Sequence, residues 1–207
     1  DFEIHTDIVV SPEDDIELRR LRITNRARIR RTITVTSYAE VVLAVPVADE
    51  LHPAFSKLFV QTEIDEQHHA ILCTRRPRSG SEQTPWMFHL MTANGTDIDD
   101  ISYETDRSQF IGRGHTTADP QALGGVLTRK LSGSQGSVLD PVAAIRYAIT
   151  LDPDQTLTID MISGMAETRA AALGLVEKYQ DRRFAERVFG VDWLHGKVVV
   201  REVNASE

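Results

Sequence analysis

The sequence contains little cysteine, few aromatic residues and no long apolar run. Its 207 residues include a single cysteine, Cys73, which excludes an intrachain disulfide and a zinc site built from several cysteines. Aromatic residues make up 6% of the chain. No run reaches the roughly 18 apolar residues that a membrane helix needs, so we expect no direct membrane insertion.

Basic residues are outnumbered by acidic ones. The chain has 23 Lys and Arg against 31 Asp and Glu, which gives a formal net charge of −8. A general nucleic-acid binder needs a basic field that replaces phosphate counterions, so no nucleic-acid partner is predicted. The 41% share of hydrophobic residues is ordinary for a globular protein, and the length suits one large domain.

Apolar and polar residues alternate through the first three quarters of the chain. The alternation starts at once, from Phe2 to Val10, and predicts a strand with one buried face. Further strands are predicted at residues 16–23, 32–45, 57–63, 70–74, 86–92, 101–104, 142–151 and 156–162. Many short strands separated by turn signals favour an antiparallel sandwich over a parallel βαβ sheet.

Two turn signals predict hairpins. Asn94-Gly95 suits a two-residue turn in which both positions need φ > 0. The sequence Asp152-Pro153-Asp154-Gln155 lies between two predicted strands, and its proline pre-sets the turn.

The pattern changes twice towards the C-terminus. Between Ile111 and Ser137 the periodicity fades, and six of the 12 glycines lie there, which predicts a long loop. From Ala166 the composition becomes helical. An apolar stripe is expected at Ala170, Leu173, Val176 and Tyr179, and Asp181 is placed to cap a second helix. These helices are expected to cover the sandwich edge or to lead into a following domain.

The loop at residues 110–115 is the best candidate for ligand contact. Gly112 and Gly114 allow close backbone approach and leave Arg113 and His115 on an exposed segment. Gly112, Arg113 and His115 are therefore the candidate substrate-binding residues, with a structural turn as the alternative. Residues 132–137 resemble a phosphate loop only in composition, because the Gly-Lys-Ser/Thr ending is absent.

Arginine is concentrated near the N-terminus. Seven arginines fall within 13 positions: Arg19, Arg20, Arg22, Arg26, Arg28, Arg30 and Arg31. Their planar side chains suit carboxylates or phosphates, so an anion-binding or domain-docking patch is one interpretation. The alternation of side chains along a strand favours a second interpretation. In it the arginines lie on the solvent-facing side of a strand pair, and their charge is balanced by Glu13, Asp14, Asp15 and Glu17.

Other reactive residue types form no recognisable site. His68 and His69 could share a metal only in a turn, no third ligand has suitable spacing, and a polar hairpin tip is favoured. Cys73 is interpreted as a small buried hydrophobic residue. Paired carboxylates could serve glycoside chemistry, but a solvated hairpin accounts for most of those at positions 97, 99, 100, 104 and 106. We predict no catalytic residue, metal or cofactor.

Several ordered blocks resemble one family. They are residues 11–15 (SPEDD), 22–25 (RITN), 35–40 (VTSYAE), 52–59 (HPAFSKLF), 105–107 (TDR), 110–113 (FIGR) and 133–136 (GSQG). Together they resemble the β-sandwich that precedes the catalytic barrel in cyclic β-1,2-glucan synthases. Those enzymes carry a glycoside hydrolase family 94 module, formerly glycosyltransferase family 36.

The resemblance implies a fold and a role. The fold would be mainly β, a galactose-mutarotase-like supersandwich of antiparallel sheets over residues 1–165. Residues 166–207 would form a helical linker leading toward an (α/α)6 catalytic barrel that this sequence lacks. The domain would be non-catalytic, shaping the substrate cleft, with the loop at 110–115 near the barrel. Implied partners are that barrel, a β-glucan oligosaccharide and a second copy in a homodimer.

The resemblance also implies a location. The parent would be an inner-membrane protein with this module, itself soluble, on the cytoplasmic side. The chain is expected to be a piece of a longer polypeptide.

Two rival functions stay open. One is a free-standing sugar-binding module, which needs aromatic faces against sugar rings, and Trp86 and Trp193 are the only tryptophans in the sequence. The other is an aldose epimerase using His89 and Glu104 as acid and base, although a core position for His89 is favoured.

Overall fold

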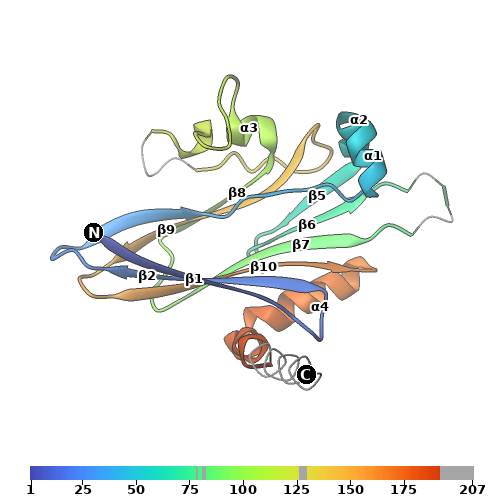
Figure 1. Ribbon diagram of the computed structural model, residues 1–207. Coiled ribbons are helices and arrows are strands. Elements are labelled where there is room, and N and C mark those ends of the chain that lie inside the picture. The colour runs from blue at the N-terminus through green and yellow to red at the C-terminus, as the bar shows by residue number, and fades with distance from the viewer. Residues whose placement is uncertain (78, 81–82, 126–129, 192–207) are drawn as a thin grey trace, which may run out of the picture.

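The computed structural model describes residues 1–77, 79–80, 83–125 and 130–191, and it confirms a mainly β fold of antiparallel sheets. Two sheets pack face to face, with α4 (Arg169–Gln180) beneath one and α3 (Arg107–Ile111) above the other (Figure 1). The larger sheet has the order β1 (Phe2–Val10), β2 (Ile16–Asn25), β10 (Thr156–Ala166), β7 (Trp86–Asn94), β6 (Ala70–Arg75) and β5 (Val60–Asp65). In the smaller sheet, β9 (Pro141–Leu151) pairs with β3 (Arg31–Thr36), β4 (Ala39–Glu40) and β8 (Asp100–Asp106).

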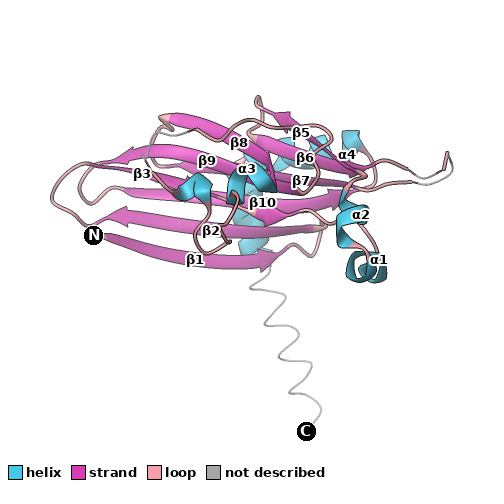
Figure 2. Cartoon of the chain, turned by 90° about the horizontal axis from the view of Figure 1, so that it is seen from above, coloured by secondary structure: helices cyan, strands magenta, loops and turns pink. Residues whose placement is uncertain are grey.

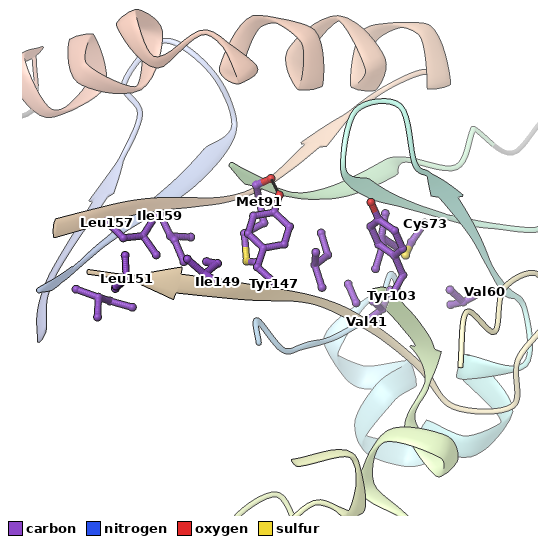
Figure 3. Close-up of a cluster of buried hydrophobic side chains, with 14 residues drawn as sticks. Val41, Val60, Cys73, Met91, Tyr103, Tyr147, Ile149, Leu151, Leu157 and Ile159 are labelled. Atoms are coloured by element: carbon purple, nitrogen blue, oxygen red, sulfur yellow. Dashed lines mark hydrogen bonds between the residues drawn. The ribbon is translucent and has the colours of Figure 1, made fainter. Parts of the chain in front are cut away.

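The main core lies between the two sheets. Figure 3 shows Tyr147 and Ile149 of β9 facing Met91 and Ile159 of the larger sheet. The Tyr147 hydroxyl donates a hydrogen bond to the Met91 carbonyl, so the one polar atom of this ring is satisfied. Cys73 lies in this core, and burial raises the pKa of its thiol to about 12, which confirms the prediction of a buried hydrophobic residue.

Helix α4 (Arg169–Gln180) covers the outer face of the larger sheet. The Thr168 hydroxyl caps it by accepting from the Ala171 amide at 3.1 Å. Ala172, Val176 and Tyr179 pack into a second core with side chains of β2, β6 and β7. The predicted helix is confirmed in type, but it covers a sheet face, not the sandwich edge. The stripe is also corrected, because Ala170 is exposed and Ala172 takes the buried position.

A second helical segment follows over residues 182–191. Asp181 Oδ1 accepts a hydrogen bond from the Arg183 amide at 3.0 Å, as expected of a capping residue. Ala185 and Val188 are buried in the same core as α4. This segment therefore continues the helical cover of the larger sheet.

Neither predicted hairpin exists. The chain leaves β7 in the larger sheet at Asn94-Gly95 and enters β8 in the smaller one, and β9 likewise crosses to β10. Turn residues encode a reversal of the chain, but they do not choose the sheet that the next strand joins. Gly95 is required for another reason. Its φ is 108°, and a Cβ there would lie 2.6 Å from the carbonyl oxygen of Thr156 at the start of β10.

Two predicted strand boundaries are wrong around two short helices. Helices α1 (Pro46–Leu51) and α2 (Pro53–Lys57) follow β4, so the strand predicted at 32–45 ends early and the one predicted at 57–63 begins at Val60. Each helix has proline in its first turn, where the missing N–H costs no hydrogen bond. Strand β1 is confirmed, but its predicted buried face is exposed.

Candidate functional site

The candidate loop is anchored by a short helix. Helix α3 (Arg107–Ile111) begins at Asp106, whose Oδ1 accepts from the Ser108 amide at 2.8 Å. Phe110 and Ile111 are buried against the outer side of β9. In Figure 1 the following segment rises beside α3, away from both sheets. A buried base therefore carries a projecting loop.

The three candidate residues have different surroundings within this loop. Gly112 ends α3 with a φ of 83°, and a Cβ there would lie 2.6 Å from the Gln121 Cβ. His115 Nδ1 lies 3.0 Å from the Asp119 carbonyl oxygen, which joins the two arms of the loop. Arg113 is exposed. Gly112 and His115 thus shape the loop, and Arg113 is the member that presents a charge to solvent.

A polar network holds the first turn of α3 in place. Arg107 Nε and the Tyr38 hydroxyl both donate to Glu40 Oε1, each at 3.0 Å. Partial burial opposes ionisation of Glu40, but these two donors outweigh it and lower the pKa of the carboxyl. The Arg107 amide also donates to the Asp140 carbonyl at 2.9 Å, and Asp140 accepts from Lys57 Nζ at 2.7 Å. Elements β4, α2 and α3 are joined by this network.

The glycine-serine segment at 132–137 does not form an anion cradle. Gly136 and Thr62 exchange backbone hydrogen bonds of 2.8 and 2.9 Å, so the segment pairs with β5 like a short additional strand. The Gly133 amide donates to the Tyr103 carbonyl at 2.9 Å. The amides that would bind a phosphate are therefore used inside the fold.

Two polar hollows border this segment, near β5, β8 and the turn that joins β5 to β6. One, of about 470 Å³, is lined by acidic residues of β5 and by Tyr103, Gln135 and Arg169. The other, of about 460 Å³, continues past Glu66, His69 and Lys130. Tyr103 is almost fully buried, so its ring offers no open face on which a sugar could stack.

His89 and Glu104 do not form an acid–base pair. His89 lies on β7 and Glu104 on β8, in different sheets, and both are buried. His89 contacts the hydroxyls of Ser37 and Ser163 at 2.8 Å each, which confirms a satisfied core histidine. The Glu104 carboxylate accepts from two backbone amides of its own strand at 3.0 Å and from Ser132. Both side chains are committed to internal hydrogen bonds.

The adjacent histidines face different partners. His68 Nδ1 lies 2.7 Å from Asp65 Oδ2, within the turn that joins β5 to β6. His69 has a φ of 51°, and its Nδ1 lies 3.3 Å from the Tyr147 hydroxyl. Burial lowers the pKa of His69. The turn separates the two rings and directs one of them towards the core.

The N-terminal arginines are matched with acids. Arg22 pairs with Asp7 of β1 at 2.7 Å, and Arg30 with Asp152 at 2.6 Å. Arg20 makes two hydrogen bonds of 2.7 and 2.8 Å to the buried carboxylate of Asp160. The solvent-facing interpretation holds for most of the seven arginines, but Arg20 is largely buried, and most of the acidic partners differ from those predicted. Glu13 and Asp14 instead pair with Arg187 and Lys178 of the C-terminal helices.

Comparison with known proteins assigns the fold to a family. The family described as "Glycosyl hydrolase 94, supersandwich domain" matches residues 1–182. This chain belongs to that family. Over 206 residues, all of this chain, it is 32% identical to a cyclic β-(1,2)-glucan synthase, NdvB, of Rhizobium meliloti strain 1021. The chain spans about 7% of the length of that relative.

Membership in the glycosyl hydrolase 94 supersandwich family explains the two-layer arrangement of antiparallel sheets. The matched range includes the whole of α4. No described helix is both long and apolar enough to cross a bilayer. Trp86 is partly buried against the core beneath α4, and Trp193 lies outside the described residues.

Proposed function

We propose that this chain is the non-catalytic β-sandwich of a glucan-synthase or glycoside-phosphorylase polypeptide, where it shapes the substrate cleft of a catalytic barrel. The observation that carries the proposal is the projecting loop at 112–119. Its base is buried through Phe110 and Ile111, and Arg113 is its exposed basic residue. A rigid base is what a loop needs to place one side chain in another domain's cleft.

The proposed ligand is a β-1,2-glucan oligosaccharide. The relative is a cyclic β-(1,2)-glucan synthase, and its name supplies this substrate class. Arg113 would donate hydrogen bonds to sugar hydroxyls from its fork of N–H groups. Gly112 and His115 would hold the loop in shape, through the left-handed φ of Gly112 and the contact of His115 with Asp119.

The proposed domain organisation follows the same logic. Residues 1–165 would form the sandwich, and residues 166–207 would begin a linker towards an (α/α)6 barrel elsewhere in the polypeptide. The family match supports an attached barrel because this chain corresponds to a small part of a much longer relative. The whole protein would be an inner-membrane protein with this module on the cytoplasmic side, and a homodimer would be a further level of assembly.

The absence of catalysis by the sandwich itself is tested with the purified chain. The chain is incubated with β-1,2-glucan and inorganic phosphate, and glucose 1-phosphate is measured. We expect no release, because the proposal assigns catalysis to a barrel outside these 207 residues. A glycoside phosphorylase serves as the positive control, and turnover by the chain would contradict the proposal.

Calorimetric titration separates this proposal from a free-standing sugar-binding module. Such a module would release heat with β-glucans at millimolar concentrations. We expect none from the isolated chain, because Tyr103 is buried in the polar hollow and Trp86 is partly buried in the core. Saturable heat from the isolated chain would favour the binding module.

A further inference from the structure

Strand β1 is an edge strand whose inner face is exposed and apolar. Among the described strands it pairs only with β2. Ile4, Ile8 and Val10 are 61, 56 and 63% exposed, and Phe2 on the same face is also exposed. An exposed, apolar strand edge invites association, and proteins usually protect such edges with charge, proline or a covering element.

The register shows that this face points towards the space between the two sheets. Ile4 lies opposite Ile23 in the antiparallel pair, and directly opposed residues share a face of the sheet. Ile23 is buried in the main core. The side chains of Ile4 and Ile8 therefore project to the core side of the larger sheet.

The smaller sheet does not reach far enough to cover them. It ends at β3, which pairs with β9 and with no other described strand. In Figure 2 the view from above places β1 along the margin of the molecule, beyond β3 and β9. A strand added beside β3 in the smaller sheet would lie over β1.

The opposite face of β1 is polar from Glu3 to Asp7, and Val9 at its end packs into the second core beneath the C-terminal helices. Glu3 and Asp7 form ion pairs of 2.7 Å with Arg26 and Arg22, and His5 lies 3.0 Å from Asp7. If β1 were a solvated edge on both faces, the inner face would be expected to carry similar residues. The contrast between the two faces marks the inner one as an unfinished sandwich interior.

We propose that a further β-strand of the same polypeptide, from outside these 207 residues, covers the inner face of β1. Its apolar residues would alternate so that one face packs on Ile4, Ile8 and Val10. The same polypeptide is the favoured source because this chain corresponds to about 7% of the length of its relative, which leaves ample chain to supply a strand. The proposal does not depend on the loop at Arg113.

Cysteine accessibility tests the proposal cleanly, because the native Cys73 is buried. Ile4→Cys and Ile8→Cys are each made in the 207-residue chain and in a longer polypeptide that includes the flanking residues of its own reading frame. His5→Cys, on the water-facing side of β1, is the matched control. We expect maleimide to modify both inner-face cysteines at least about tenfold more slowly in the longer polypeptide, since a covered site reacts only through local opening. The control should react equally in both.

Two results would overturn the proposal. One is equal modification of Ile4→Cys and Ile8→Cys in both polypeptides. The other is protection in the 207-residue chain itself that rises with protein concentration, alongside dimers in sedimentation, because the covering element would then be a second copy. Hydrogen exchange of the unmodified proteins provides the same comparison without substitution. Amides of β1 should exchange more slowly in the longer polypeptide.

Discussion

His89 connects the two sheets of the sandwich through its side chain. It lies on β7, and its ring nitrogens contact Ser163 of β10 and Ser37 of the segment between β3 and β4, each at 2.8 Å. Ser37 in turn donates to the Ile145 carbonyl and accepts from the Ile145 amide. Burial, reinforced by the charge of Arg19, lowers the pKa of His89 to about 4.

This lowered pKa makes the stability of the fold depend on pH. In the unfolded chain the pKa of histidine is about 6.5. Between about pH 6.5 and pH 4 the unfolded state binds the extra proton, so the free energy of unfolding falls as the pH falls through this window. Linkage gives a loss of about 2 kcal/mol at pH 5 from this one residue. Partly buried His69 shifts in the same direction.

The assay is urea unfolding at about pH 7.5 and pH 5, with the free energy of unfolding extrapolated to water. We expect His89→Gln to lose about 2 kcal/mol less than the native chain between these pH values. Any constant cost of the substitution cancels in that difference. Gln61→Asn, a substitution of an exposed residue on β5 that carries no titratable group, is the control and should keep the native pH dependence. An unchanged pH dependence in His89→Gln would refute the reasoning.

Two further predictions concern packing and buried charge. Gly164→Ala should lower the free energy of unfolding by about 1–3 kcal/mol, because the new Cβ would lie 2.7 Å from the ring of Phe88 inside the second core. Asp160→Ala should cost about 3–5 kcal/mol, because it leaves the Arg20 guanidinium, 12% exposed, without its buried partner. Asp152→Ala removes an exposed partner and should cost far less than Asp160→Ala, because solvent screens the pair. Urea unfolding measures the free energy of unfolding of all three variants. Equal losses in the two aspartate variants would contradict the assignment of Asp160 as buried and Asp152 as exposed.

The strands could be predicted from the sequence because alternation is a local signal. Strands β1, β2, β6, β7, β9 and β10 lie close to their expected positions. The two turns were also located correctly as chain reversals. The partner sheet was not predictable, since a strand such as β9 is buried along most of its length and carries no period that distinguishes its two faces.

The remaining differences arise from long-range contacts. Pro46 and Pro53 are local signals for the starts of the short helices α1 and α2. The first signal is hard to recognise because the valine-rich segment before Pro46 has the composition of a strand. The acid partners of the arginines come from strands distant in sequence, as Asp160 does for Arg20. The inner face of β1 is predicted to be buried because apolar and polar residues alternate along this strand, as they do in a strand with one covered face. In the structure that face is exposed.

The position of Arg113 could be predicted, but the distinct roles within its loop could not. Two glycines around an arginine are a local sign of an exposed turn. That α3 precedes the loop, and that Asp119 binds His115, depends on how the segment folds back on itself. The network of Tyr38, Glu40 and Arg107 joins three separate segments and has no local signature.

The central claim is that the sandwich places Arg113 in the substrate cleft of an attached barrel. The most direct test is the Michaelis constant for β-1,2-glucan of the barrel-containing polypeptide, with Arg113→Ala compared against Arg28→Ala, an exposed arginine in the turn between β2 and β3. Loss of one charge-assisted hydrogen bond predicts a KM raised about tenfold for Arg113→Ala. Arg28→Ala should retain the native KM. Equal Michaelis constants for the two variants and the native protein would contradict the claim.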